Sequence, residues 1–182
     1  LLLRYAAIEK QKAQTHLEEA HQMLQHEQDR SERLLLNILP GPIAERLKNS
    51  SQTIADGFAD VSVMFVDIVN FTRIAEGLNP QQVFSMLNKV FSSFDKQDKK
   101  YGLEKIKTIG DAYMVDGGLN NQRSDYSDAL VDMALEMRDL LQHDFQVNQL
   151  HLEVRIGIGT GPVVAGVVGK KKFIYDLWGD TV

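Results

Sequence analysis

The chain contains no cysteine, which excludes disulfide bonds, thiolate metal sites and cysteine nucleophiles. It has only four prolines, and no apolar run approaches the roughly 18 residues that a membrane span requires. An excess of basic residues is also lacking, because 20 Lys and Arg stand against 25 Asp and Glu, for a formal net charge of −5. Nucleic-acid binding needs a basic surface, so the sequence argues against nucleic acid as a main partner.

The remaining composition is that of a soluble globular protein, with 43% hydrophobic and 25% charged residues. Its 182 residues suffice for one domain and an appendage. The chain opens with LLLRY, without an initiator methionine, and shows no signal peptide. We therefore expect a fragment of a longer protein.

Residues 1–39 contain neither glycine nor proline, which predicts one long helix. Eight of the eleven positions at alternating spacings of three and four are apolar, so a coiled coil with a second helix is expected. The alternative is a solitary amphipathic helix lying on its own domain. Three polar members weaken the seam and suggest a marginal or switchable pairing. The eleven positions are Leu3, Ala6, Lys10, Ala13, Leu17, Ala20, Leu24, Glu27, Ser31, Leu34 and Ile38.

Residues 40–59 are predicted to form a linker with a short helix of its own. Pro40, Gly41 and Pro42 break the first helix, and IAERLKN at 43–49 restarts a short one. The globular part is then expected from about Asp60 to Val182.

The globular part shows the order strand, helix, strand, strand, helix, strand. This order predicts an α+β fold with a ferredoxin-like βαββαβ sheet. Such a fold covers one face of an antiparallel sheet with helices and leaves the other face free for a ligand or partner, but it does not decide function. The expected elements are strand 61–69, helix 79–102, strands 103–110 and 112–116, helix 124–145, and strands within 152–169 and 171–180.

Two aspartates stand out because their positions demand compensation. Asp67 ends an apolar strand, and Asp111 lies in the tight turn between the next two strands. In the predicted sheet the first strand lies between its neighbours, so the two carboxylates can approach and would repel unless they share a cation or a proton. Mg²⁺ suits one or two carboxylates plus phosphate oxygens. The alternative is a turn-capping aspartate beside an ordinary hairpin.

The segment after Asp67 offers groups for a triphosphate. Val69, Asn70, Phe71 and Thr72 lead from the strand into a helix, and such a turn can present backbone N–H groups to phosphate. Asn70 and Thr72 add polar side chains.

Four blocks of sequence resemble the class III nucleotidyl cyclases, the adenylyl and guanylyl cyclase catalytic domain. They are FVDIVNFT, EKIKTIGDAYM, RIGIGTGPVVAGVVG and YDLWGDTV, in this order across residues 60–182. NILPGPIAERLKN is similar to the transducer segment that precedes this domain, and the upstream heptads are similar to its signalling helix.

The resemblance implies an adenylyl cyclase that converts ATP into 3′,5′-cyclic AMP and pyrophosphate. It implies that Asp67, Ile68 and Asp111 hold two Mg²⁺ or Mn²⁺ ions per site, and that Asp67 and Asp111 are catalytic in this sense. It also implies that Lys107 and Asp176 select the base, since guanylyl cyclases carry glutamate and usually cysteine there. A head-to-tail homodimer is implied, with metals and base selectors of one site on opposite subunits.

Two other functions stay open from the sequence: a guanylyl cyclase, and an inactive regulatory domain that only dimerises. The family carries an asparagine and, four residues later, an arginine just after WGDTV, so the domain is expected to be incomplete at its C-terminus and this polypeptide impaired. An upstream sensory or membrane domain and a cytoplasmic location, at a membrane face through such a segment, are expected. Asp116 stands where an apolar residue is expected, and its role is open.

Overall fold

The computed structural model describes residues 2–49, 54–119, 124–147, 150–169 and 172–182. The chain forms two compact units, Leu1–Gln52 and Thr53–Val182. Within the described residues no helix is both long and apolar enough to cross a membrane.

The first unit consists of two helices. Helix α1 spans Leu2–Leu36, which confirms the predicted long helix, and α2 spans Gly41–Asn49. The amide of Leu39 still donates to the carbonyl of Leu35, so the helical turn closes directly before Pro40. Lys48 on α2 pairs with Glu32 on α1 at 2.6 Å.

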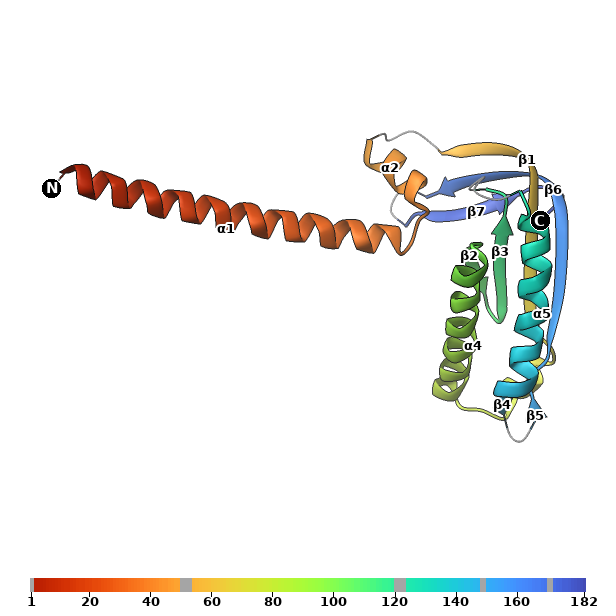
Figure 1. The fold of residues 1–182 in the computed structure, drawn as a ribbon. Coiled ribbons are helices and arrows are strands. Elements are labelled where there is room, and N and C mark those ends of the chain that lie inside the picture. The colour runs from red at the N-terminus through yellow and green to blue at the C-terminus, as the bar shows by residue number, and fades with distance from the viewer. Residues whose placement is uncertain (1, 50–53, 120–123, 148–149, 170–171) are drawn as a thin grey trace. The chain divides into compact units, whose positions relative to one another are not determined.

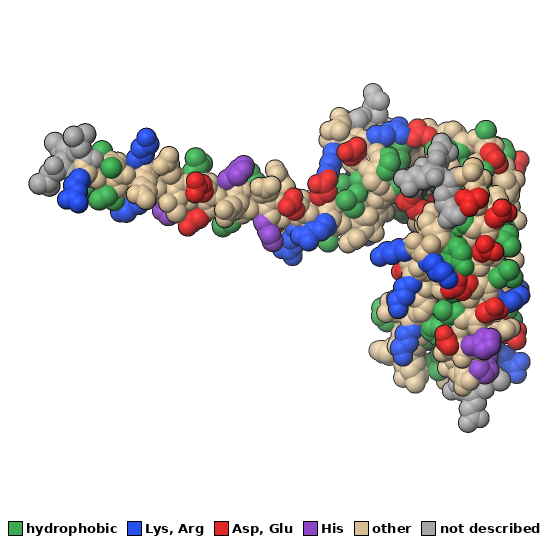
Figure 2. Space-filling model, in the orientation of Figure 1, with side chains coloured by type: hydrophobic (Ala, Val, Ile, Leu, Met, Phe, Trp, Pro, Cys, Tyr) green, Lys and Arg blue, Asp and Glu red, His purple; other side chains and the backbone are tan. Residues whose placement is uncertain are grey.

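Helix α1 leaves large apolar side chains in solvent. Leu17 is 71% exposed, Leu24 57% and Ile38, just beyond the helix, 69%. Figure 2 shows hydrophobic side chains scattered among charges of both signs along this helix. Such a surface provides the apolar half of a pairing seam, and the coiled coil itself stays a prediction.

The second unit has the predicted order of elements, with several additions (Figure 1). The additions are the short helix α3 and the small pair β4–β5. The elements are β1 (Ala55–Ile68), α3 (Phe71–Glu76), α4 (Pro80–Tyr101), β2 (Glu104–Ile109), β3 (Ala112–Gly117), α5 (Tyr126–Asp144), β4 (Gln146–Val147), β5 (Leu150–His151), β6 (Val154–Val168) and β7 (Ile174–Trp178).

The main sheet is antiparallel and has the strand order β2-β3-β1-β6-β7. The first strand therefore lies between β3 and β6, as the split βαβ pattern predicts. The α+β, ferredoxin-like class is confirmed, with β7 as an additional edge strand.

The hydrophobic core fills the space between the sheet and helices α4 and α5, which lie on the same face of the sheet (Figure 1). Paired residues of neighbouring strands share a face. Met64, Val66 and Tyr113 point into this core. The alternating residues, Asp67 among them, lie on the opposite face, which we call the open face.

Two boundaries differ from the sequence prediction. Strand β1 begins at Ala55 rather than at 61, because its first half pairs with the far end of β6 across a register shift between Phe58 and Val61. The strand-rich segment 152–169 contains one long bent strand, and glycine permits close packing along it. A Cβ on Gly166 would lie only 2.5 Å from the carbonyl oxygen of Ile54.

Candidate active site

Asp67 and Asp111 come together on the open face. Asp67 pairs with Ala112 in the β1–β3 ladder, and Asp111 precedes Ala112 in a turn that Gly110 allows by its φ of 63°. Burial and then the hydrogen bond to Asp67 raise the pKa of the Asp111 carboxyl. The opposite happens to Asp67, whose pKa is lowered by Arg155 and by the hydrogen bond from Asp111. The two carboxyl groups therefore lie close enough to shift each other's pKa, and a cation between them would relieve their repulsion.

Arg155 is a member of this site that the sequence reasoning missed. It stands directly opposite Asp67 in the β1–β6 ladder, and its guanidinium donates to the Asp67 carboxylate. The arginine side chain is 74% exposed, so the ion pair contributes little to stability. The sequence offered one signal for Arg155, a cationic residue within the apolar strand EVRIGIG. Only the strand register shows that this arginine faces Asp67.

The loop after Asp67 runs directly into α3. Asn70 adopts a left-handed conformation, with φ 56°, and its carbonyl accepts from Ile74 N–H. The N–H of Val69 is already bonded to the carbonyl of Glu153 at 2.8 Å. The N–H groups of Phe71 and Thr72 fall in the first helical turn, where no intrahelical acceptor exists.

Val69 and Asn70 also line a groove of about 400 Å³ between α3 and the β4–β5 pair. Arg73, His151 and Glu153 contribute its charged or titratable groups. Neither Asp67 nor Asp111 lines this groove. The groove is therefore adjacent to the aspartate pair but does not contain the two carboxyl groups.

Lys107 and Asp176 form a second candidate pair. Lys107 is opposite Met114 in the β2–β3 ladder, which places it on the open face. Its ammonium group donates to the Asp176 carboxylate on β7, and Asp176 also accepts from the backbone N–H of Leu177. The side chains are 31% and 15% exposed, so the pair is accessible without being fully solvated.

The residues at the aspartate pair fit a magnesium-type ion. The backbone of Ile68 lies close enough to Asp111 to lower the pKa of its carboxyl group, which brings the Ile68 peptide into the site as well. Among the described residues no group of three or more His, Cys, Asp or Glu side chains could enclose a metal. Two carboxylates with open coordination positions match a Mg²⁺ whose remaining ligands are water and phosphate oxygens.

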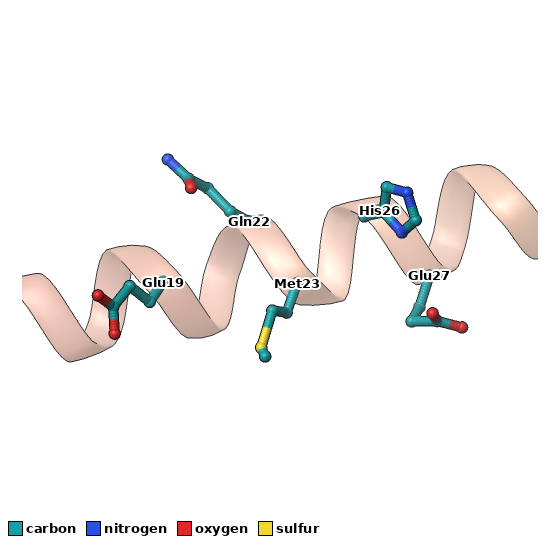
Figure 3. A pocket seen from close by; sticks show the side chains of 5 residues that line it. All are labelled: Glu19, Gln22, Met23, His26 and Glu27. Carbon is teal, nitrogen blue, oxygen red and sulfur yellow. The ribbon is translucent and has the colours of Figure 1, made fainter.

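A larger hollow lies elsewhere and does not belong to this site. It measures about 510 Å³ and is bordered by Glu19, Gln22, Met23, His26 and Glu27. Figure 3 shows that all of these come from one helix, with Met23 and His26 on opposite sides of it. A hollow walled by a single helix has no second element to enclose a small molecule.

The fold and these two pairs agree with a single protein family. The Adenylate and Guanylate cyclase catalytic domain family matches residues 54–182. The chain belongs to this family, and so to the class III nucleotidyl cyclases.

Adenylate cyclases and guanylate cyclases are similar to this chain at comparable sequence identity. An adenylate cyclase of Mycobacterium tuberculosis is 44% identical over 164 residues, which cover 90% of this chain and 37% of that protein. The rat guanylate cyclase soluble subunit alpha-2 is 39% identical over 166 residues, 91% of this chain and 23% of that protein. The chain thus spans well under half the length of these relatives.

A solved structure shares the fold at a TM-score of 0.66. It is the catalytic core of a rhodopsin-guanylyl cyclase with converted specificity, in complex with ATPαS, and it is 35% identical. The match covers 70% of this chain and 69% of that one. Family and fold are therefore established, and the choice of nucleotide has to come from the site.

Proposed function

We propose that this domain belongs to an adenylyl cyclase that converts ATP into 3′,5′-cyclic AMP and pyrophosphate. The observation that carries the proposal is the Lys107–Asp176 pair, a donor and an acceptor held together at one accessible place. In the cyclisation, the ribose 3′-oxygen forms a bond to the α-phosphorus and loses its proton. The bond from the α-phosphorus to the bridging oxygen breaks, and pyrophosphate leaves.

The two side chains complement the edge of adenine. Adenine N1 accepts a hydrogen bond and its 6-amino group donates one. Lys107 supplies a donor for N1, and Asp176 supplies an acceptor for the amino group. Guanine reverses both roles, with N1–H as donor and O6 as acceptor, so in the same orientation it would meet two mismatches. In the free protein each of the two side chains satisfies the other.

The aspartate pair would hold the metals. Asp67, Asp111 and the Ile68 backbone are the groups that would bind two Mg²⁺ or Mn²⁺ ions, which supply charge neutralisation at the triphosphate and activation of the 3′-hydroxyl. The contact between the two carboxyl groups supports this, because their mutual repulsion is what a cation relieves. The backbone from Val69 to Thr72 would orient the phosphates.

Arg155 has a role in the same proposal. Its partner Asp67 would turn to the metals when nucleotide binds, and the guanidinium would be released. A side chain that is 74% exposed can then swing to a phosphate oxygen, for which the planar guanidinium is well suited.

A complete site is proposed to need two copies of the chain. Lys107 and Asp111 are four residues apart, yet Lys107 is directed to β7 and Asp111 to β1. This divergence supports a head-to-tail homodimer in which Lys107 serves one site and Asp111 the other. The apolar positions along α1 would pair the same two copies upstream.

The second candidate is a guanylyl cyclase, which the 39% identity to a guanylate cyclase subunit favours. Product analysis decides between the two. The full-length chain is incubated with ATP or GTP and Mg²⁺ or Mn²⁺, and cyclic nucleotide and pyrophosphate are quantified. We expect cyclic AMP and pyrophosphate in equal amounts. Cyclic GMP as the main product would overturn the assignment, and no product from either nucleotide would support a regulatory domain.

A further inference from the structure

A buried tyrosine lies between two acidic side chains on the helix face of the sheet. Tyr113 on β3 is fully buried, and its ring packs edge-on against Phe94 of α4 with centroids 5.4 Å apart. Its hydroxyl contacts the Asp95 carboxylate at 2.6 Å and also the carboxyl group of Asp98. Lys105 on β2 completes the cluster, 2.8 Å from Asp95 and 4.8 Å from the centre of the Tyr113 ring.

The number of protons gives these contacts a direction. A tyrosine hydroxyl has one proton to donate and can accept another. It therefore cannot donate to two carboxylates at once, and one of the acids must carry a proton and donate to it. Asp95 is about half exposed and balanced by Lys105, so it fits the charged acceptor. Asp98 is only 6% exposed, and its Oδ1 has no hydrogen-bond partner in the described part of the chain, so it fits the neutral donor.

The cluster is attached to the β2–β3 hairpin, which carries Lys107 and Asp111, one member of each candidate pair. Lys105 lies two residues before Lys107, and Tyr113 lies two residues after Asp111. The β2–β3 pairing shifts register between Lys105 and Lys107, so that Lys105 lies on the helix face and Lys107 on the open face. Helix α4 is fixed to the same hairpin by its end, since the carbonyl of Asp98 accepts from the N–H of Leu103.

We propose that the hydrogen-bonded network Asp98–Tyr113–Asp95–Lys105 anchors the β2–β3 hairpin to α4 and so positions it. The network requires Asp98 to be protonated. Its function is to set Lys107 and Asp111 at their places on the open face, so its catalytic consequence rests on the proposed cyclase function. None of the four residues touches the nucleotide, and all act through the hairpin.

The charges around Asp98 bear on its proton. Burial raises the pKa of Asp98 to about 7; the hydrogen bond shared with Tyr113 lowers this pKa, the charge of Asp95 raises it and that of Lys105 lowers it. Asp116, on the other face of β3, adds a further negative group when ionised. On the α5 side Glu136 is already paired with Lys100 and Tyr101. Loss of the Asp98 proton would leave a negative charge in the core and remove the hydrogen bond that Asp98 donates to Tyr113.

The first test measures amide hydrogen exchange in the full-length chain, which does not depend on any cyclase activity. Tyr113→Phe removes the hydroxyl that links Asp98 and Asp95 in the network. Tyr101→Phe is the matched control, because it removes a hydroxyl–carboxylate bond from the same helix that leads to α5 instead. We expect Tyr113→Phe to accelerate exchange across β2–β3 about tenfold or more, with β1–β6 little changed. Equal acceleration in all strands, or the same pattern in Tyr101→Phe, would overturn the anchoring role.

The second test is Asp98→Asn, which keeps a neutral donor facing Tyr113. Below pH 7 we expect this variant to protect the hairpin amides from exchange as well as the unmodified chain does. Above pH 7 the variant should keep this protection, whereas the unmodified chain should lose it. In cyclase assays Tyr113→Phe should lower the ratio of kcat/KM for ATP to that for GTP, and Asp98→Asn should restore it relative to Asp98→Ala. If Asp98→Asn exchanges as fast as Tyr113→Phe, the proton is not needed and the proposal fails, whatever the nucleotide preference proves to be.

Discussion

Lys107 on β2 and Asp176 on β7 form an ion pair between the two edge strands of the sheet, although they are 69 residues apart in sequence. The two edges of a five-stranded sheet can meet only if the sheet is strongly curled. The long strands β1 and β6 supply this curvature, with a register shift in β1 and glycines along β6. The pair is therefore a product of the whole sheet rather than of one local motif.

The aspartate pair leads to a first prediction. Asp67→Ala or Asp111→Ala should lower Mg²⁺-dependent cyclase turnover by roughly a hundredfold to ten-thousandfold, because each removes several kcal/mol of charge stabilisation. Circular dichroism should show the fold intact. Asp139→Ala is the matched control, since it removes an exposed acid on α5 that pairs with its neighbour Arg138. Near-normal Mg²⁺ turnover in both site variants would contradict the metal assignment.

The second prediction concerns site sharing. Neither an Asp67→Ala chain nor a Lys107→Ala chain should be active alone. When the two are co-expressed, one of the two sites in each heterodimer keeps every group, so activity should return to a substantial fraction of the unmodified level. The measurement compares the purified mixture with each variant alone, after mass spectrometry has established heterodimers. Heterodimers without a gain in activity would show that each site is built from one chain.

The third prediction addresses helix α1. Leu24 lies on the predicted seam and is 57% exposed, whereas Ile8 is 53% exposed but lies off it. We expect Leu24→Lys to weaken self-association of the chain, because it places a charge in the apolar seam of two helices. Ile8→Lys should leave association unchanged. Sedimentation equilibrium of both variants decides, and equal effects would favour a solitary helix without a seam.

The fourth prediction gives Asp116 a measurable consequence. It is 2% exposed, and its Oδ2 has no hydrogen-bond partner among the described residues. Burial, with the charge of Glu104, raises the pKa of Asp116 from 3.8 to about 8. The folded state then binds a proton that the unfolded state has lost, so this group lowers the free energy of unfolding as pH rises from about 4 to 8.

Asp116→Asn should remove that contribution. At pH 9 we expect the free energy of unfolding, measured by urea titration, to be higher in the variant than in the unmodified chain. The expected difference is roughly 1–3 kcal/mol, the usual cost of an unsatisfied buried polar group. At pH 4 the two should differ little. Asp139→Asn, an exposed acid, serves as the control. A stability difference that is independent of pH would show that Asp116 is ionised in the folded state.

The sequence predicted the order of elements and the meeting of Asp67 with Asp111, because both follow from local patterns and one topological rule. Hydrophobic runs mark the central strands, and the split βαβ arrangement brings the end of the first strand beside the hairpin turn. Lys107 and Asp176 were found through family resemblance, since nothing in their local spacing indicates that they meet.

Other features needed the three-dimensional register. Residues 55–60 alternate between exposed and half-buried positions and carry two aspartates, so no apolar run marks them as a strand. Arg155 acquires its meaning only from the partner that the β6 register gives it. Asp116 and Tyr175 of β7 are far apart in sequence, yet burial and then the Asp116 carboxylate raise the pKa of Tyr175. These are long-range consequences that a single local window does not contain.

The central claim is that Lys107 and Asp176 read adenine, and the double variant Lys107→Glu with Asp176→Cys tests it most directly. The measurement is kcat/KM for ATP and for GTP in the full-length chain with Mn²⁺, for both proteins. The introduced glutamate would face the N1 acceptor of adenine, and unpaired groups of this kind cost about 1–3 kcal/mol each, or more when charged. The account predicts that the ATP-to-GTP ratio falls roughly ten- to a hundredfold or more. An unchanged ratio would contradict it.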